Sequence, residues 1–258
     1  MKSTREQVFT CVIPARYSST RFPGKPLAII GGKTMIERVY NQAAQVIDRV
    51  YVATDDERIF NAVTSFGGKA VMTSSSHRSG TDRIAEAAEK ILDNGMSHEN
   101  VIINVQGDEP FILPEQIAAL RDCFTDQSVE IATLVREVRP DEDLFNPNHP
   151  KVVLSKTMDA IYFSRSVIPY VRDKEKNEWN KSHRFYKHLG IYGYRASALS
   201  SITKLPQSPL ELAESLEQNR WIENGYRIRV AVTKWESLGI DTPEDLEKAA
   251  AFLLSKSK

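Results

Sequence analysis

The first half of the chain alternates short apolar, β-branched runs with longer stretches whose apolar residues recur three and four positions apart. Residues 8–13 (VFTCVI) show the first pattern, which is typical of a buried strand, and residues 34–47 (TMIERVYNQAAQVI) show the second, which is typical of a helix. Repeated strand–helix–strand order requires parallel strands joined by right-handed crossovers, with helices covering both faces of the sheet. We therefore expect an α/β fold, a three-layer sandwich around a mostly parallel sheet. The further expected strands are 49–56, 69–73 and 101–106, and the further helices are 57–68, 79–95 (capped by Ser79 or Thr81) and 113–124.

The second half is less regular. A helix is predicted over 208–225, because Ser208 is a good cap, Pro209 suits the first position and Gly225 can end it. A last helix over 242–256 has Thr242 as its cap, and residues 172–184 are polar enough for an exposed excursion. We expect one domain over 1–258 with a smaller sub-domain near 130–200. The expected strands here are 130–138, 149–156, 160–171, 188–196 and 226–234.

Composition excludes several classes of protein. The 258 residues carry 34 basic and 34 acidic side chains, so no global positive field attracts nucleic acid. No stretch approaches 18 apolar residues, and the N-terminus has no signal-peptide cleavage pattern, so we expect no membrane span. Cys11 and Cys123 are too few for a disulfide framework. These features predict a soluble protein of a reducing compartment.

The segment 14–26 (PARYSSTRFPGKP) follows the first expected strand and gathers Arg16, Arg21 and Lys25 around small residues and a glycine. Ligands of open α/β sheets lie at the carboxyl ends of strands. Exposed N–H groups together with cations form an anion site, so the segment suits a triphosphate better than the alternative of a solvated basic loop. The downstream IGGKT lacks the first glycine of a phosphate-binding loop and is expected to form a turn.

Two acids also follow strand-like runs. Asp108 lies in the turn QGDEP and Asp241 in GIDTPEDL. Carboxylates of this kind suit Mg²⁺, which takes one or two of them together with phosphate oxygens, although a turn acid or helix cap is an equally ordinary role. His188 and Tyr192 share one face of a strand, and Arg165 could bind a carboxylate through two hydrogen bonds.

Taken together, these segments resemble the sugar-activating nucleotidyltransferases, and among them the cytidylyltransferases of the acid sugar 3-deoxy-manno-octulosonate (Kdo). The stretch IPARYSSTRFPGKPL is typical of cytidylyltransferases in general, whereas NVQGDEP, HLGIYGYR and DTPEDL are specific to the Kdo branch. The resemblance runs in order from about residue 8 to 250. The matching stretches are IPARYSSTRFPGKPL, VATDDERI, HRSGTDRIAEA, NVQGDEP, FNPNHPKVV, YFSRSVIPY, HLGIYGYR, SPLELAESLEQNR and GIDTPEDL.

The resemblance implies a dinucleotide-binding-like sheet and a role for each matching residue. The expected catalytic residues are Arg16, Lys25, Asp108 and Asp241, of which the two acids hold Mg²⁺. The expected nucleotide-binding residues are Ala15, Arg16, Ser18, Ser19, Lys25, Ser79, Gly80 and Thr81. The expected sugar-binding residues are Gln106, Arg165, His188, Tyr192 and Glu217, with Arg165 near the sugar carboxylate.

The implied activity is the reaction of CTP with Kdo to give CMP-Kdo and pyrophosphate for lipopolysaccharide synthesis, in a cytoplasmic homodimer. The resemblance also implies that the sub-domain near 130–200 serves sugar binding and dimerisation. Two departures from the family's commonest pattern, Arg78 in place of glutamine and KWES in place of a glycine-rich approach to Asp241, leave open an 8-amino analogue of Kdo. A sialate-like acid sugar is the other enzymatic alternative. A non-catalytic nucleotide-binding module is the rival from a different class, but such a module needs no pair of metal carboxylates. The sequence assigns no role to Arg21.

Overall fold

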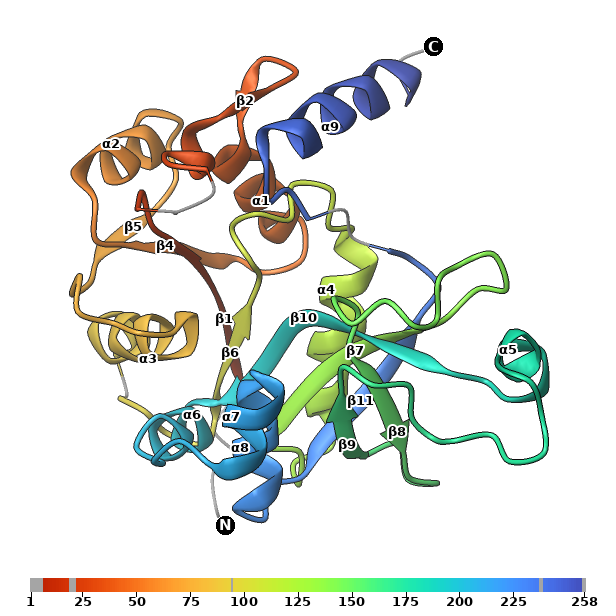
Figure 1. The fold of residues 1–258 in the computed structure, drawn as a ribbon. Coiled ribbons are helices and arrows are strands. Elements are labelled where there is room, and N and C mark those ends of the chain that lie inside the picture. The colour runs from red at the N-terminus through yellow and green to blue at the C-terminus, as the bar shows by residue number, and fades with distance from the viewer. Residues whose placement is uncertain (1–6, 19–21, 94, 237–238, 257–258) are drawn as a thin grey trace.

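The computed structural model describes residues 7–18, 22–93, 95–236 and 239–256, and its central feature is a nine-stranded mixed sheet (Figure 1). The strand order is β11-β7-β10-β6-β1-β4-β5, with β8 paired to β10 and to β9. The strands are β1 (Val8–Ala15), β4 (Arg49–Thr54), β5 (Ala70–Met72), β6 (Asn100–Asn104), β7 (Ile131–Glu137), β8 (Lys151–Leu154), β9 (Ala160–Ser164), β10 (Tyr186–Arg195) and β11 (Ile228–Thr233), and a separate hairpin joins β2 (Ile29–Ile30) to β3 (Lys33–Thr34). The α-helices are α1 (Met35–Ala44), α2 (Glu57–Ser65), α3 (Gly80–Ile91), α4 (Pro114–Asp122), α5 (Trp179–Ser182), α6 (Ala196–Ile202), α7 (Pro209–Glu214), α8 (Glu217–Glu223) and α9 (Pro243–Lys256).

Strand direction confirms the predicted fold class. β5, β4, β1 and β6 are parallel neighbours, and β7 pairs in parallel with β11. β10 lies between β6 and β7 and is antiparallel to both, so it alone is reversed along the described path. The carboxyl ends of β1 and β6 therefore meet at one edge of the sheet, where an open α/β fold binds its ligand.

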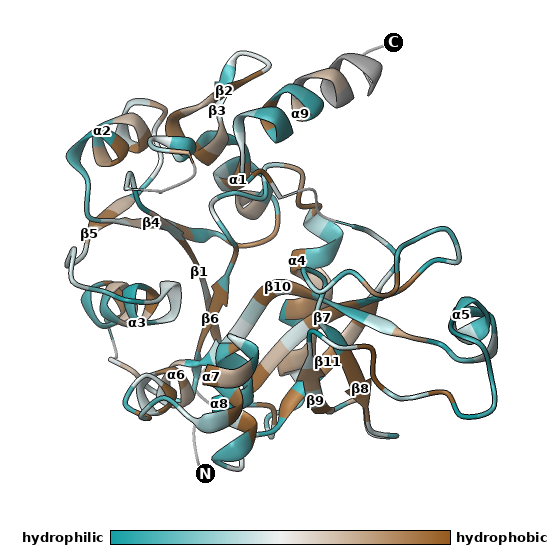
Figure 2. Cartoon of the chain, viewed as in Figure 1, coloured by the Kyte–Doolittle hydropathy of each residue, from teal (hydrophilic) through white to brown (hydrophobic). Residues whose placement is uncertain are grey.

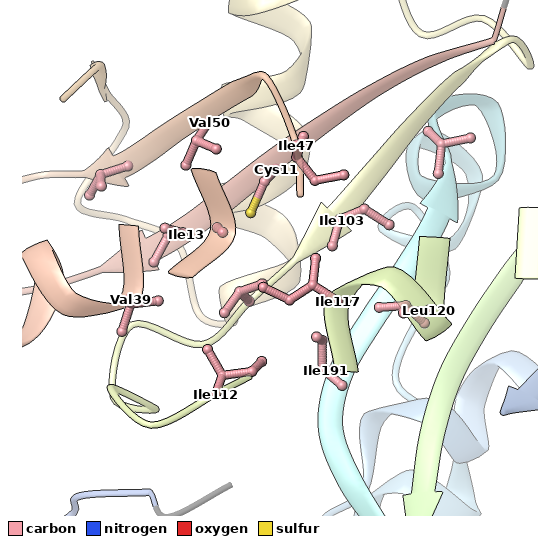
Figure 3. Close-up of a cluster of buried hydrophobic side chains, with 14 of the residues drawn as sticks. Cys11, Ile13, Val39, Ile47, Val50, Ile103, Ile112, Ile117, Leu120 and Ile191 are labelled. Carbon is pink, nitrogen blue, oxygen red and sulfur yellow. The ribbon is translucent and has the colours of Figure 1, made fainter. Parts of the chain in front are cut away.

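Helices cover both faces of the sheet, as the alternation of elements predicts. Cys11 and Ile13 of β1 point to one face, where they pack among side chains of α1, α2 and α4 (Figure 3). Val12 points to the opposite face and packs among side chains of α3, α6 and α8. Successive residues of a strand face opposite sides, so the largely apolar run VFTCVI contributes side chains to the cores on both faces of the sheet. In Figure 2 the apolar colour accordingly concentrates on the strands and on the inner sides of the helices.

Caps fix where several helices begin. The Thr34 side chain accepts a hydrogen bond from the Glu37 N–H at the start of α1, and Ser79 rather than Thr81 caps α3. Ser208 caps α7 as predicted, with Glu211 completing a capping box. Thr242 also caps α9, because its hydroxyl accepts from the Asp245 N–H.

Three expectations are corrected. The predicted helix over 208–225 is two helices, because Ser215 adopts a left-handed conformation (φ 52°) that ends α7 before α8 begins. The predicted strand over 160–171 ends at Ser164, where the backbone leaves β8. The helix predicted over 79–95 ends at Ile91, one turn before Gly95.

Residues 130–200 contribute β7 and β10 to the central sheet, so this region continues the main domain through shared backbone hydrogen bonds. A small separate cluster of Val138, Leu144, Trp179 and Phe185 lies under the polar excursion at 172–184. Trp179 is buried there and anchors α5, whereas most of the excursion is exposed, as predicted. A role of this region in dimerisation stays a prediction. Across the described residues no helix has the length and apolarity to cross a membrane.

Candidate active site

A cavity of about 260 Å³ lies at the carboxyl ends of β1 and β6, the edge at which the polar clusters of the sequence were expected to meet. Three segments far apart in the chain form it: the loop after β1, the turn after β6 and the start of α3. Asp241 adds a side chain from the segment before α9. The lining residues are Pro14, Ala15, Arg16, Lys25, Pro26, His77, Arg78, Ser79, Gly80, Arg83, Gln106, Gly107, Asp108 and Asp241.

Lys25 joins the two predicted metal acids. Its Nζ donates to Asp108 Oδ2 at 2.7 Å and to Asp241 Oδ1 at 3.2 Å. Lys25 is the first residue of a short 3₁₀ helix (Lys25–Leu27). The preceding residue, Gly24, has φ 71°, a conformation that glycine adopts without steric cost. The Gly24 N–H donates to the Tyr17 carbonyl at 2.9 Å, which closes the loop and fixes the origin of the lysine side chain.

Two backbone features place the acids. At Gly107 an added Cβ would lie 2.7 Å from the carbonyl oxygen of Pro14, so only glycine lets the turn after β6 approach the end of β1 this closely. The Ile240 N–H donates to the Asp108 carbonyl at 2.9 Å and brings the next residue, Asp241, to the site. The two acids are thus neighbours although 133 positions separate them in the chain.

Arg16 lines the cavity and is exposed, and Ala15 lines it from the end of β1. The exposed Ser18 lies on the same loop. Ser19 and Arg21 lie outside the described residues, so the nucleotide-binding role of Ser19 stays a prediction and Arg21 stays without an assigned role.

The start of α3 supplies Ser79 and Gly80 to the cavity lining, as expected for nucleotide-binding residues. Thr81, the second residue of α3, is buried, and its hydroxyl donates to Glu217 Oε2 at 2.6 Å. Thr81 therefore supports Glu217 instead of lining this cavity.

Sequence reasoning missed Arg83, which is buried and lines the cavity. Its guanidinium donates to Asp55 Oδ2 at 2.9 Å and to Thr73 Oγ1 at 2.7 Å, tying α3 to the ends of β4 and β5. The signal was present, because an arginine four positions after the cap Ser79 projects from the same side of the helix start.

The predicted sugar-binding residues fall into separate places. Gln106 lines the cavity and its Nε2 donates to the Gly190 carbonyl at 3.2 Å. His188 and Tyr192 lie together on β10 with ring centroids 5.2 Å apart, and His188 Nε2 is 3.0 Å from Thr133 Oγ1. Burial lowers the pKa of His188 to about 3, so its imidazole is neutral at ordinary pH.

Glu217 lines a second cavity of about 560 Å³, which it shares with Asp82, Glu211 and Arg220. Arg220 Nη2 donates to Glu217 Oε1 at 2.6 Å, but burial is the larger effect and raises the pKa of Glu217. Arg78 lines both cavities, so it lies at their junction.

Arg165 is held by backbone carbonyls. Its guanidinium donates to the carbonyls of Glu214 at 2.7 Å, Pro147 at 3.0 Å and Ser215 at 3.3 Å. These bonds tie the end of β9 to the break between α7 and α8. Its expected contact with a sugar carboxylate stays a prediction, and such a contact would compete with these three acceptors.

The two carboxylates fit a divalent cation whose other ligands come from the substrate. Asp108 and Asp241 direct one carboxylate oxygen each to the same ammonium group, so both can reach a cation in that position. No group of three or more His, Cys, Asp or Glu side chains within the described residues could enclose a metal. Mg²⁺ suits such a site, since it is commonly bound by one or two carboxylates and by phosphate oxygens of the substrate.

Comparison with known proteins identifies the family. The model of the cytidylyltransferase family matches residues 10–228. The chain belongs to this family. The 3-deoxy-manno-octulosonate cytidylyltransferase of Parabacteroides distasonis is 62% identical over 96% of the chain and 99% of its own length. The protein of the same name from Phocaeicola vulgatus is 57% identical over 95% of the chain and 97% of its own length.

Solved structures of other proteins share the fold. CMP:2-keto-3-deoxy-manno-octonic acid synthetase, solved in complex with CTP, superposes with a TM-score of 0.88 at 43% identity and covers 96% of the chain and 99% of its own. The 4-diphosphocytidyl-2C-methyl-D-erythritol synthase of Anaerococcus prevotii superposes with a TM-score of 0.61 at 13% identity, over 96% of the chain and 99% of its own. This second likeness concerns the fold alone.

Proposed function

We propose that the protein is a cytidylyltransferase that activates Kdo with CTP. The anomeric hydroxyl oxygen of Kdo attacks the α-phosphorus of CTP, a new P–O bond forms, and the bond to the β-phosphate oxygen breaks to release pyrophosphate. The observation that carries the proposal is the meeting of Lys25, Asp108 and Asp241 beside Arg16 in one cavity at the carboxyl ends of β1 and β6. The 43% identical relative solved with CTP and the two Kdo-named relatives support the choice of both substrates.

The residues that line the cavity have separate roles in the transfer reaction. Arg16 and Lys25 present positive charge where the triphosphate lies, and at an effective dielectric constant near 20 one cation about 4 Å from a phosphate charge contributes roughly 4 kcal/mol. The start of α3, with Ser79 and Gly80, lines the same cavity as the loop after β1. Asp108 and Asp241 would hold Mg²⁺, which neutralises phosphate charge and orients the reacting oxygens when bound.

Pyrophosphate release from CTP in the presence of Mg²⁺ and Kdo tests the proposal directly. A panel of Kdo, its 8-amino analogue and a sialate decides the acid sugar. Lys25→Ala should lower turnover roughly 100- to 1000-fold, the loss typical of a removed charge-stabilising donor. Lys33→Ala is the matched control, because Lys33 is half-exposed, forms an ion pair with Glu37 and lies outside the cavity lining. Normal turnover in Lys25→Ala would refute the phosphate role.

The metal role has its own test. Asp108→Asn keeps the shape of the side chain but removes its charge, so Mg²⁺-dependent turnover should be lost. Calorimetric titration with Mg²⁺ and CTP should show weakened metal binding in the same variant. Retained turnover would remove Asp108 from the metal site.

The proposal extends to a homodimer in the bacterial cytoplasm that supplies activated Kdo for lipopolysaccharide synthesis. The family resemblance supports this extension. Sedimentation equilibrium of the full chain tests the dimer, and a monomer at micromolar concentration would oppose it.

A further inference from the structure

The Lys25 ammonium group lies beside both Asp108 and Asp241, in the position that a metal ion bound by the two acids would take. Its Nζ is 2.7 Å from Asp108 Oδ2 and 3.2 Å from Asp241 Oδ1. The lysine side chain is 12% exposed, against 36% for Asp108 and 50% for Asp241, so the ammonium is the more enclosed partner of the three.

The arrangement has an electrostatic reason. Two carboxylates directed at one point repel each other unless a positive charge separates them. An ammonium group offers three donors in any direction, and two of them are engaged here by the acids. Arg16 lines the same cavity, but no hydrogen bond or ion pair joins it to either acid in the described part of the chain.

We infer that Lys25 is the resident counter-ion of the metal site and is exchanged for the divalent cation when the nucleotide binds. This inference rests on the proposed function, since it takes Asp108 and Asp241 as the metal ligands. Lys25 then has two successive partners: the two carboxylates before the substrate binds, and the triphosphate afterwards. The ammonium and the metal cannot occupy the space between the carboxylates together.

Competition of this kind has a consequence for binding. Before CTP binds, a divalent cation must displace Lys25, so its affinity is lower than the two carboxylates alone would give. CTP offers the ammonium a new anionic partner within the same cavity and thereby frees the acids. Nucleotide and metal are therefore coupled through the lysine as well as through direct contact.

The experiment measures Mn²⁺ binding to the full chain without nucleotide, by electron paramagnetic resonance of the free ion. Lys25→Met, which keeps a long side chain but removes the charge, should bind Mn²⁺ about tenfold more tightly than the unmodified protein, within the usual range of such coupling. Arg16→Met is the matched control: it removes a cation from the same cavity that does not contact the acids, and should change nucleotide-free Mn²⁺ affinity by less than about twofold. Asp108→Asn in the Lys25→Met background should abolish the gain and so locate the ion.

Equal Mn²⁺ affinity in Lys25→Met and the unmodified protein would overturn the inference, and so would an equal gain in Arg16→Met. Thermal unfolding gives a second measurement on the same variants: Mn²⁺ should raise the Tm of Lys25→Met more than that of the unmodified protein. Equal rises in Tm would contradict the exchange. The proposed function is judged separately, by pyrophosphate release in the unmodified protein, so an active enzyme with unchanged Mn²⁺ affinity in Lys25→Met refutes the exchange alone.

Discussion

Gly107→Ala is the substitution whose effect can be worked out most directly from the structure. The new Cβ would lie 2.7 Å from the carbonyl oxygen of Pro14. Ordinary van der Waals contact begins near 3.4 Å, so the turn after β6 and the end of β1 must separate by about 0.7 Å. Both contacting groups belong to the backbone of neighbouring strand ends, which cannot rotate away as a side chain would.

Overpacking of this kind costs about 2 kcal/mol. For a chain of this length that corresponds to a fall in Tm of about 6 °C, at roughly 3 °C per kcal/mol. Because Asp108 is the next residue, the shift also moves a predicted metal ligand, and a displacement near 1 Å can lower turnover by about 100-fold.

Differential scanning fluorimetry and the pyrophosphate-release assay measure the two effects. Gly190→Ala is the matched control for stability, because a Cβ there meets no atom within 4 Å and the residue does not need a left-handed backbone. Its Tm should change by less than about 2 °C. A Gly107→Ala protein with unchanged Tm and unchanged turnover would refute the close-approach argument.

Three further predictions concern partly buried polar groups. Hydrogen bonds from the Arg139 N–H, Lys187 and Arg136 outweigh the burial of Glu142 and lower its pKa from 4.5 to about 2. The free energy of unfolding should therefore fall as pH drops from 4.5 to 2, and urea titrations should show that it depends less on pH in Glu142→Gln. His188, with its pKa near 3, should keep neutral-imidazole ¹⁵N shifts from pH 8 to pH 5, and a titration near pH 6.5 would show that it is not buried as described. Arg165→Lys should lower stability by about 2 kcal/mol because guanidinium bonds to backbone carbonyls are lost, and an effect only on the KM for Kdo would instead assign Arg165 to the substrate.

Several features of the site could be read from local sequence. The spacing of apolar residues identified the α/β class, because burial on a sheet or helix repeats with the period of that element. Caps at Ser208 and Thr242 were also readable, since a hydroxyl before a helix satisfies a nearby N–H. The cations after β1 and the acid in QGDEP were expected at the binding edge, where the cavity lies.

Other features depend on which strands become neighbours. No sequence pattern distinguishes the antiparallel β10 from a parallel strand. Likewise, no sequence pattern distinguishes the break at Ser215 from a continuous helix. The spacing of Arg83 from the cap Ser79 indicates its side of the helix, but only the structure shows its contacts with Asp55 and Thr73 beside the cavity.

By itself the sequence determined the class of fold, the loop rich in cations and the two candidate metal acids, because each of these is encoded by residues close together in the chain. The tertiary structure decided that Lys25 reaches across 83 residues to Asp108 and across 216 residues to Asp241. That pairing depends on the order of the strands and on the close approach at Gly107, neither of which leaves a local pattern. Distances between remote residues are set by the packing of the whole sheet, so the geometry of the site is a property of the fold.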